Sequence, residues 1–284
     1  MMQWSYDTLL KWGTDELTAH SVDNASVDAW YLLEHIYGIS RVDFLIRRND
    51  PFDEVQMKQS ADYQALIHRR SEGYPVQYLT GSTEFMGLPF LVNESVLIPR
   101  QDTEVLVETA LAMMKPECRL LDMCTGSGCI LLSLAKLGTV AEGVGVDISE
   151  GALKVAERNR ENLGLPQVRL VHSNLFESVE GVFDMIVSNP PYIPNDEELE
   201  HSVKDFEPHV ALFGGDDGLK FYRIIFERSK LILNEKSMLA FEIGYNQKEA
   251  LMAEAAKYFP DSKIEVLKDM NGKNRMLFIY NHCD

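Results

Sequence analysis

The sequence predicts an α/β fold, in which helices cover both faces of a mostly parallel sheet and a smaller helical domain comes first. From Asp102 onward, strand-like and helix-like segments alternate along the chain. This alternation is typical of parallel sheets, because each crossover between parallel strands usually carries a helix. The first 72 residues show helical spacing of apolar side chains instead. With 284 residues and 45% hydrophobic composition, the chain can bury a core in each part.

The first 73 residues are expected to form the helical domain, to which we assign substrate recognition. Apolar side chains recur at helical spacing between Trp30 and Tyr37. Ser40 can cap the next helix, and a third helix is expected to begin near Asp53 and to run to about Arg70. Residues 74–100 follow, where glycine and proline punctuate the short β-rich runs PFLV and SVLI. They predict a β-hairpin linker.

Residues 101–284 are predicted to form the larger, catalytic domain. The expected strands are Arg119 to Met123, Glu142 to Asp147, Val168 to His172, Phe183 to Ser188, Ser237 to Ile243, Ile264 to Lys268 and Met276 to Tyr280. The expected helices are Thr103 to Met114, Ile130 to Leu137, Gly151 to Leu163, Leu219 to Leu233 and Gln247 to Tyr258. Asn271-Gly272, a turn-forming pair, separates the last two strands and predicts an antiparallel hairpin at the end of the sheet.

Charge and cysteine content limit the possible partners. A net charge of -17 opposes broad affinity for nucleic acid, so no direct nucleic-acid binding is expected. No apolar run approaches the roughly 20 residues that span a bilayer, and the N-terminus lacks a secretory signal pattern. We therefore expect a cytoplasmic protein without membrane contact. We also expect a monomer, although none of these observations bears on oligomeric state. Neither CxxC spacing nor nearby histidines suggest a metal site among the cysteines, which are expected to be reduced: Cys118, Cys124, Cys129 and Cys283.

A glycine loop follows the first predicted strand of the larger domain. After Cys124 come Thr125, Gly126, Ser127 and Gly128, and then an amphipathic helix. Glycines here let a ligand approach the backbone at the carboxyl edge of the sheet. A nicotinamide-type fingerprint needs a third small residue where this chain has Leu131. The bulky Leu131 therefore argues against a loop that binds a dinucleotide.

Polar residues end the neighbouring strands. Asp122 can anchor the loop through backbone bonds or reach the methionine part of a cofactor. Asp147, 19 residues after Gly128, can accept hydrogen bonds from both hydroxyls of a ribose or cap the next helix, for which Ser149 is the better candidate. Asn174 can bind an adenine edge or serve as a turn residue. Leu175, beside it, could line the adenine face.

The run MIVSNPPYI is the most informative in the chain. It places Asn189, Pro190, Pro191 and Tyr192 after a buried strand. The prolines remove two backbone donors, so the loop presents acceptors. The Asn189 oxygen and the Pro190 carbonyl can take both hydrogens of a planar NH2 group and orient it toward a methyl donor. The Tyr192 ring could stack on that group or pack into the core. Together with the glycine loop and Asp147, this run predicts an S-adenosylmethionine-dependent methyltransferase.

The chain resembles a known family, the glutamine methyltransferases of peptide-chain release factors, often called PrmC or HemK. The similarity spans nearly the whole chain and includes GYPVQYLTGSTEFMGLPF, LIPRQDTE, LLDMCTGSGCI, VGVDIS, VSNPPYI, FEPHVALFGGDDGL and KDMNGKNRMLF. It implies a class I methyltransferase fold, with a Rossmann-like seven-stranded sheet. It also implies methylation of the glutamine side-chain amide in the Gly-Gly-Gln loop of class 1 release factors.

The resemblance also implies residue roles. Asn189, Pro190 and Tyr192, with Pro191 between them, would hold the glutamine, and the loop from Thr125 to Gly128 with Asp147 would hold S-adenosylmethionine. Arg100 would lie near the mouth of the site, contacting substrate or pairing with Asp102 or Glu104. The chain departs from the family pattern at several positions. Cys124 stands where family members commonly carry Gly, and Gln101 stands where they often carry Pro. Asn174 and Leu175 stand where an Asp and frequently an aromatic residue occur.

Two other functions remain open at this level. A DNA or RNA exocyclic-amine methyltransferase could use the same Asn-Pro-Pro-Tyr run, but it would need a basic and aromatic recognition surface to hold an extruded base. No such composition is evident in the first hundred residues. A binding module with a relic transferase fold is the other possibility, and the presence of Asn189 and Asp147 argues against it.

Overall fold

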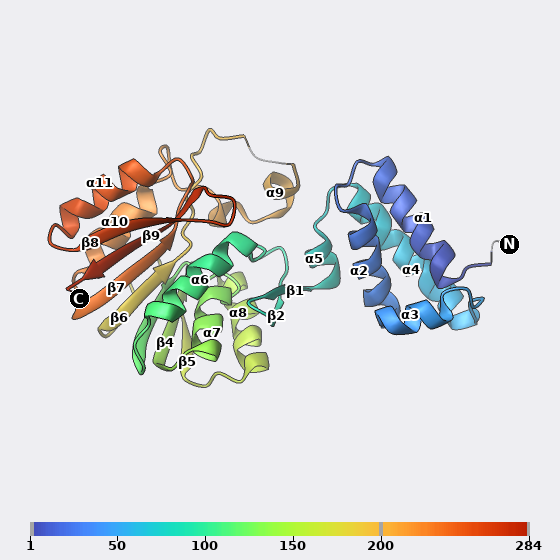
Figure 1. Ribbon diagram of the computed structural model, residues 1–284, viewed down its shortest axis with the longest axis horizontal. Helices are drawn as coiled ribbons and strands as arrows, with labels where there is room; N and C mark the ends of the chain where they lie inside the picture. Colours follow the sequence, from blue (N-terminus) through green and yellow to red (C-terminus); the bar gives the residue numbers. More distant parts are fainter. Residues whose placement is uncertain (1–2, 199–200, 283–284) are drawn as a thin grey trace. The chain divides into compact units, whose positions relative to one another are not determined.

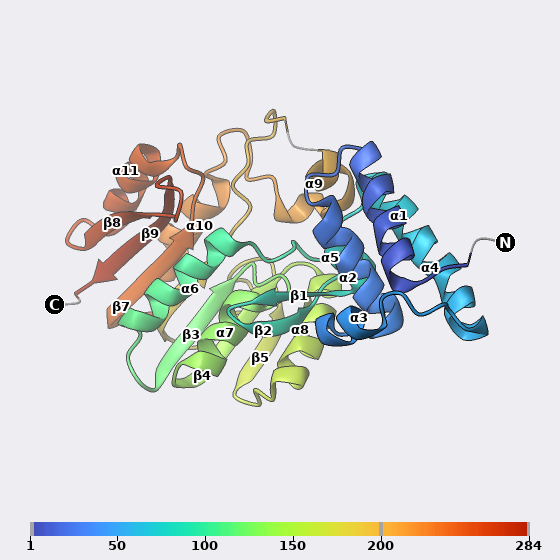
Figure 2. The same ribbon diagram turned by 45° about the vertical axis from the view of Figure 1, so that its right-hand side comes forward.

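The computed structural model describes residues 3–198 and 201–282, and the chain divides into two compact units. One unit contains the N-terminal residues up to Ser82 and a short later segment that ends at Phe206. The other contains the remaining described residues. Figures 1 and 2 show the helical first unit and the sheet of the second. Cys283 lies outside the described residues.

The N-terminal unit is helical, as its sequence predicts. Its helices are α1 (Tyr6–Ala19), α2 (Ala25–Tyr37), α3 (Arg41–Arg47), α4 (Glu54–Ser71), α5 (Val76–Thr80) and α9 (His201–Phe206). Ser40 caps α3 by accepting a hydrogen bond from the Asp43 amide at 3.1 Å, and Asp53 forms a capping box at the start of α4. Trp30 and Tyr63 are fully buried in its core.

The segment expected as a hairpin linker is only partly a hairpin. Strands β1 (Ser82–Phe85) and β2 (Leu88–Leu91) pair, but α5 precedes them as a short helix that the sequence reading missed. The SVLI run, Ser95 to Ile98, forms no strand, which corrects the expectation from its β-rich composition. Val96 and Ile98 are buried by side-chain packing instead, with exposed fractions of 1% and 3%. Burial alone therefore explains the apolar run.

The second unit contains the predicted seven-stranded sheet. Its strands are β3 (Cys118–Met123), β4 (Val140–Asp147), β5 (Val168–His172), β6 (Phe183–Ser188), β7 (Leu233–Glu242), β8 (Lys263–Lys268) and β9 (Asn274–Asn281). They lie in the order β5-β4-β3-β6-β7-β9-β8. The β8 and β9 hairpin is antiparallel, with its second strand inserted between β7 and β8.

Helices cover both faces of this sheet because its central strands are apolar on both sides. In β3, Leu120 packs into one core cluster and Leu121 into the other, as successive strand side chains must. Helices α6 (Gln101–Met113), α7 (Cys129–Leu137) and α8 (Glu150–Leu163) contribute to the first cluster. Helices α10 (Lys220–Ser229) and α11 (Lys248–Tyr258) contribute to the second. The predicted helix from Leu219 to Leu233 was too long, since β7 already begins at Leu233.

The connections reverse direction between β3 and β6. From β3 the chain continues to β4 and β5 on one side, and it returns to β6 and β7 on the other. In open parallel sheets, ligands bind outside the carboxyl ends of the strands at such a reversal. The motifs at the ends of β3, β4, β5 and β6 therefore meet at one edge of the sheet.

Candidate active site at the carboxyl edge of the sheet

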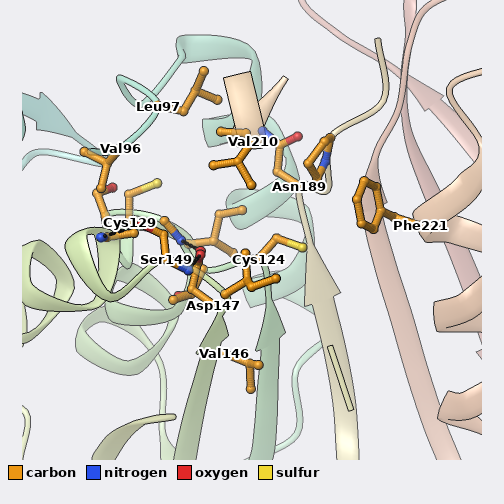
Figure 3. A pocket seen from close by; sticks show the side chains of 18 of the residues that line it. Val96, Leu97, Cys124, Cys129, Val146, Asp147, Ser149, Asn189, Val210 and Phe221 are labelled. Atoms are coloured by element: carbon orange, nitrogen blue, oxygen red, sulfur yellow. Dashed lines mark hydrogen bonds between the residues drawn. The ribbon is translucent and has the colours of Figure 1, made fainter. Parts of the chain in front are cut away.

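A cavity of about 240 Å³ lies at this edge, within the second unit. Its walls come from the glycine loop after β3, the ends of β4 and β5, the corner after β6, and the segment that leads into α6. In Figure 3, Asp147 and Asn189 stand at the ends of separate strands, and both line this cavity. The predicted cofactor and substrate motifs therefore share one pocket.

The glycine loop has a backbone that side chains would disturb. Gly126 and Gly128 have φ angles of +55° and +81°, in the region that L-residues rarely adopt. A Cβ on Gly128 would also lie 2.9 Å from Leu132 of α7. Thr125, Gly126 and Ser127 line the cavity, whereas Gly128 is not among the lining residues and is the N-cap residue of α7.

Asp147 connects the end of β4 to this loop. Its Oδ2 accepts a hydrogen bond from the Gly126 amide at 2.9 Å, and its Oδ1 accepts one from the Ser149 amide at 2.9 Å. Ser149 caps α8 through the Ala152 amide, as expected. Because each carboxylate oxygen can accept more than one hydrogen bond, Asp147 keeps acceptor capacity on the cavity side. Burial raises the pKa of this carboxyl, and its backbone donors oppose the rise.

Asp122 lies behind the loop and does not line the cavity. It is fully buried, and its Oδ2 accepts a hydrogen bond from the Thr125 hydroxyl at 2.6 Å. This contact corresponds to the loop-anchoring interpretation of Asp122, although it comes from a side chain instead of the backbone. Burial raises the pKa of the Asp122 carboxyl to about 7, despite the Thr125 hydrogen bond.

The end of β5 contributes Asn174 and Leu175, and both line the cavity. The Asn174 amide donates a hydrogen bond to Glu177 at 3.0 Å, which leaves its carbonyl oxygen available. Leu175 has a φ of +51°, an uncommon angle for a residue with a Cβ. Ile148, which was not predicted as a site residue, adds an apolar wall and is 51% exposed. Its position directly after Asp147 could have indicated that it lines the same site.

Some residues of the Asn-Pro-Pro-Tyr corner line the cavity, and others pack away from it. Asn189 and Pro191 line the cavity, whereas Pro190 and Tyr192 are not among the lining residues. The Tyr192 hydroxyl donates a hydrogen bond to Glu242 at 3.2 Å, and its ring packs against the core cluster on the α10 and α11 face. Of the two placements considered for Tyr192, the structure shows the packed one.

A second glycine run supports this corner. A Cβ on Gly214 would lie 2.5 Å from the Pro191 carbonyl oxygen, and one on Gly218 would lie 2.2 Å from the Tyr192 carbonyl oxygen. The FGGDDG run thus packs backbone against backbone with the corner, which only glycine allows. The Tyr192 carbonyl also accepts a hydrogen bond from the Gln247 side-chain Nε2 at 2.9 Å.

Arg100 lines the cavity and forms an ion pair with Glu207. The pairing with Asp102 or Glu104 considered for it is wrong. Asp102 pairs with Arg275 at 3.4 Å, and Glu104 accepts a hydrogen bond from the Met86 amide. Glu207 is distant in sequence, so local spacing could not identify it as the partner.

Several further lining residues were not predicted from the sequence, because they come from segments without a recognised chemical motif. They are Val96, Leu97, Thr103, Val210, Lys220 and Phe221. Figure 3 shows the Phe221 ring and the Val210 side chain among those that line the pocket. Leu97 and Thr103 lie in the LIPRQDTE run and Val210 lies in the FEPHVALFGGDDGL run, and both runs stood out only by resemblance.

Comparisons with known proteins identify the family. Residues 8–81 match the model of the PrmC N-terminal domain, and residues 101–206 match that of the methyltransferase small domain. A release factor glutamine methyltransferase of Geobacter sulfurreducens is 40% identical, covering 88% of this chain and 87% of the relative. One of Agrobacterium fabrum is 39% identical, covering 92% of each chain. This chain is a release factor glutamine methyltransferase by family.

Solved structures of low identity support the fold of this family member. A methyltransferase from Pyrococcus furiosus superposes with a TM-score of 0.56 at 19% identity, covering 78% of this chain and all of that one. The 16S rRNA N2 G1207 methyltransferase of Thermus thermophilus gives 0.50 at 18% identity, covering 71% of this chain and 50% of that one. Among the described residues of this glutamine methyltransferase, no helix is long and apolar enough to cross a membrane.

Cys124, directly before the glycine loop, has a backbone conformation that disfavours residues with a side chain. Cys124 has a φ of +61°, where glycine carries no steric cost. Its side chain lines the cavity. Burial raises the pKa of the Cys124 thiol, and the nearby Asp147 and Asp122 carboxylates raise it further. The thiol therefore stays protonated and unreactive at neutral pH.

Proposed function

We propose that this enzyme transfers a methyl group from S-adenosylmethionine to the side-chain amide nitrogen of the glutamine in the Gly-Gly-Gln loop of class 1 release factors. The observation that carries the proposal is that Asn189 and Asp147 line one cavity. The Asn189 side-chain oxygen suits a planar amide, and the Asp147 carboxylate suits the hydroxyls of a ribose. The names of the relatives, release factor glutamine methyltransferases, support the choice of substrate.

The cavity residues fit the parts of the cofactor. Gly126 offers a backbone free of side chains at its surface, and Asp147 offers carboxylate oxygens for the ribose hydroxyls. Ile148 and Leu175 supply apolar surface for the adenine ring, and Asn174 supplies a carbonyl oxygen for its amine. When bound, the cofactor supplies a methyl group activated by a positively charged sulfur.

Two carboxyl groups beside the glycine loop suit a cationic donor, and the cationic Arg100 and Lys220 line other parts of the cavity wall. Asp147 lines the cavity, and Asp122 lies behind the same loop. A carboxylate near a positive charge lowers the free energy of the bound cation, and it does so more strongly in a site shielded from water. Bringing the cation in also favours the ionised forms of these carboxyls.

The corner after β6 orients the substrate. An amide nitrogen is a poor nucleophile, because its lone pair is delocalised into the carbonyl group. In the proposal, the Asn189 side-chain oxygen, which lines the cavity, and the carbonyl of the adjacent Pro190, which lies outside the lining, accept the two amide hydrogens. These bonds fix the nitrogen in line with the methyl group and concentrate electron density on it. Pro190 and Pro191 lack N–H groups that could compete. The amide proton leaves after transfer, so this scheme requires no strong base.

In the proposal, the substrate protein contacts the cavity wall and the N-terminal domain. Arg100 lines the cavity with 39% of its side chain exposed, and in the proposal it contacts the release-factor loop while Glu207 holds its guanidinium. The helical N-terminal domain, residues 1–73, is assigned to recognition of the release factor, with residues 74–100 as the linker to the catalytic domain at 101–284.

Labelled methyl transfer tests this function. The enzyme is incubated with methyl-labelled S-adenosylmethionine and a class 1 release factor, and the Gly-Gly-Gln peptide is then analysed by mass spectrometry. We expect one added methyl group on the glutamine, and none on a release factor in which alanine replaces that glutamine. Parallel reactions contain DNA or RNA. Label on nucleic acid and none on the release factor would overturn the proposal.

A further inference from the structure

One buried carboxyl group connects three segments of the cavity wall. Glu242 is the last residue of β7 and is 3% exposed. Its Oε1 accepts a hydrogen bond from the Tyr192 hydroxyl at 3.2 Å, and its Oε2 accepts one from the Thr103 hydroxyl. Its main-chain carbonyl accepts a hydrogen bond from the Tyr222 hydroxyl at 2.6 Å. Glu242 itself does not line the cavity.

Each of these three partners belongs to a segment that reaches the cavity. Thr103 lines the cavity from the first turn of α6. Tyr192 directly follows Pro191, which lines it, and Tyr222 directly follows Phe221, which lines it as well. A shift of the Glu242 side chain would therefore be transmitted to Thr103 and Tyr192 together.

The carboxyl group is costly at this position. Its neighbours on β7, Leu239 and Phe241, are fully buried in the core. Burial raises the pKa of Glu242, although the Thr103 hydroxyl, the charge of Arg275 and the Tyr192 hydroxyl oppose the rise. A buried carboxyl needs hydrogen-bond partners to offset its lost hydration, and an apolar residue of similar size would avoid that cost. Stability alone therefore does not explain a glutamate here.

The proline-rich corner needs such an external support. Pro190 and Pro191 have no N–H groups, so these two residues cannot be held by donating backbone hydrogen bonds. Tyr192 is the first residue after them, and its side chain is fixed at one end by the backbone and at the other by Glu242. The bond between the Tyr192 hydroxyl and Glu242 thus limits rotation of the segment that carries Asn189.

We propose that Glu242 is a positioning residue for methyl transfer, which acts through the Tyr192 hydroxyl to hold the Asn189 and Pro190 acceptors in line with the methyl donor. The inference rests on the proposed function and adds to it a residue that does not touch the reactants. Methyl transfer requires alignment of the nitrogen, the methyl carbon and the sulfur. A displacement of about 1 Å can slow such a reaction roughly 100-fold.

A double-mutant cycle tests this role. Glu242→Gln, Tyr192→Phe and the double variant are compared with wild type for methylation of a release factor at saturating cofactor. We expect each single variant to lose kcat by roughly 10- to 100-fold. The double variant should be no slower than the slower single variant, because both changes remove the same contact. The KM for the release factor and the Kd for the cofactor should stay within about threefold of wild type.

Glu254→Gln is the matched control. Glu254 is also a buried acid of the second unit, 9% exposed on α11, but its carboxylate pairs with Lys257 and Arg223 and lies outside the cavity lining. We expect its kcat to stay at the wild-type value. A general effect of removing a buried charge would instead lower kcat in this variant as well.

The outcomes separate the inference from the function on which it rests. If wild type does not methylate the release factor, the proposed function itself fails. If wild type is active and Glu242→Gln retains kcat within twofold, or if the two single losses multiply in the double variant, the positioning role is wrong. Should Glu242→Gln fail to fold, Tyr192→Phe alone decides: wild-type kcat in that variant overturns the proposal.

Discussion

The Asp147 carboxylate accepts a hydrogen bond from the Gly126 amide at 2.9 Å, which fastens the end of β4 to the glycine loop after β3. Asp147 is the last residue of β4, Gly126 lies in the loop after the adjacent strand β3, and both line the cavity. One acidic side chain therefore shapes the loop and also presents acceptors to a ligand. Changes at Asp147 should affect cofactor binding before they affect the chemistry.

Asp147→Ala should weaken binding of S-adenosylmethionine by about 10- to 100-fold, since a hydrogen bond to a charged group contributes about 1.5–3 kcal/mol. Isothermal titration calorimetry measures this change. Asp147→Asn, which keeps one acceptor oxygen, should lose less affinity. A Kd for Asp147→Ala within twofold of wild type would remove Asp147 from the cofactor site.

Asn189→Ala should lower kcat by roughly 100- to 1000-fold, the range seen when a preorganised polar group is removed from a reacting centre. The Kd for the cofactor should change by no more than a few fold, because Asp147 and the glycine loop remain. Asn174→Ala serves as the control, since it should alter cofactor binding with little effect on kcat at saturation. Turnover of Asn189→Ala within a few fold of wild type would contradict the proposed role.

Gly218→Ala should disturb the substrate corner. The added Cβ would lie 2.2 Å from the Tyr192 carbonyl oxygen, at a φ of +71°. We expect the free energy of unfolding to fall by about 2–4 kcal/mol, and kcat to fall with it. Gly164→Ala separates the effect of the clash from that of the positive φ. Its φ is +68°, but nothing lies within 4 Å of the new Cβ. If urea denaturation showed the same loss of unfolding free energy in both variants, the clash with the Tyr192 carbonyl oxygen would not be the cause.

Cys124→Gly should raise the free energy of unfolding by up to about 1 kcal/mol. It removes the steric cost of a φ of +61°, partly offset by the greater freedom of glycine in the unfolded chain. Chemical denaturation of the two proteins at neutral pH measures the difference. A loss of more than 1 kcal/mol would mean that packing of the thiol against the loop outweighs the backbone strain.

The Asp122 carboxyl predicts a pH dependence of stability. Its pKa is raised to about 7 in the folded protein, above about 3.9 in the unfolded chain. Between these values the folded state holds a proton that the unfolded state has released, so this group's contribution to stability is greatest below pH 4 and is lost as pH rises to about 7.

Asp122→Asn should remove that dependence, because the amide stays neutral and can still accept from the Thr125 hydroxyl. Urea denaturation of both proteins at several pH values should show the variant gaining stability relative to wild type between pH 4 and pH 7. A constant difference across that range would show that Asp122 does not titrate there.

Local sequence patterns predicted most of the fold and much of the site. Every strand of the large sheet was placed from its apolar run, and β5 and β6 match their predicted bounds. Ser40 and Ser149 were recognised as helix caps from their position before an amphipathic segment. Asp147 was singled out as the acidic end of a strand and Asn189 by the two prolines that follow it, and both line the cavity. Such signals depend on neighbours along the chain.

The tertiary structure decided which side of the corner each residue faces and which distant residues support it. No local pattern could place the Tyr192 ring against the core, pair Arg100 with Glu207, or bring Val210 and Phe221 to the cavity. Those relationships arise from the packing of segments far apart in sequence. The sequence by itself determined the strands, the loops and the chemical groups at their ends, because these follow from short-range periodicity and turn chemistry. Which groups meet depends on how the sheet and its helices pack.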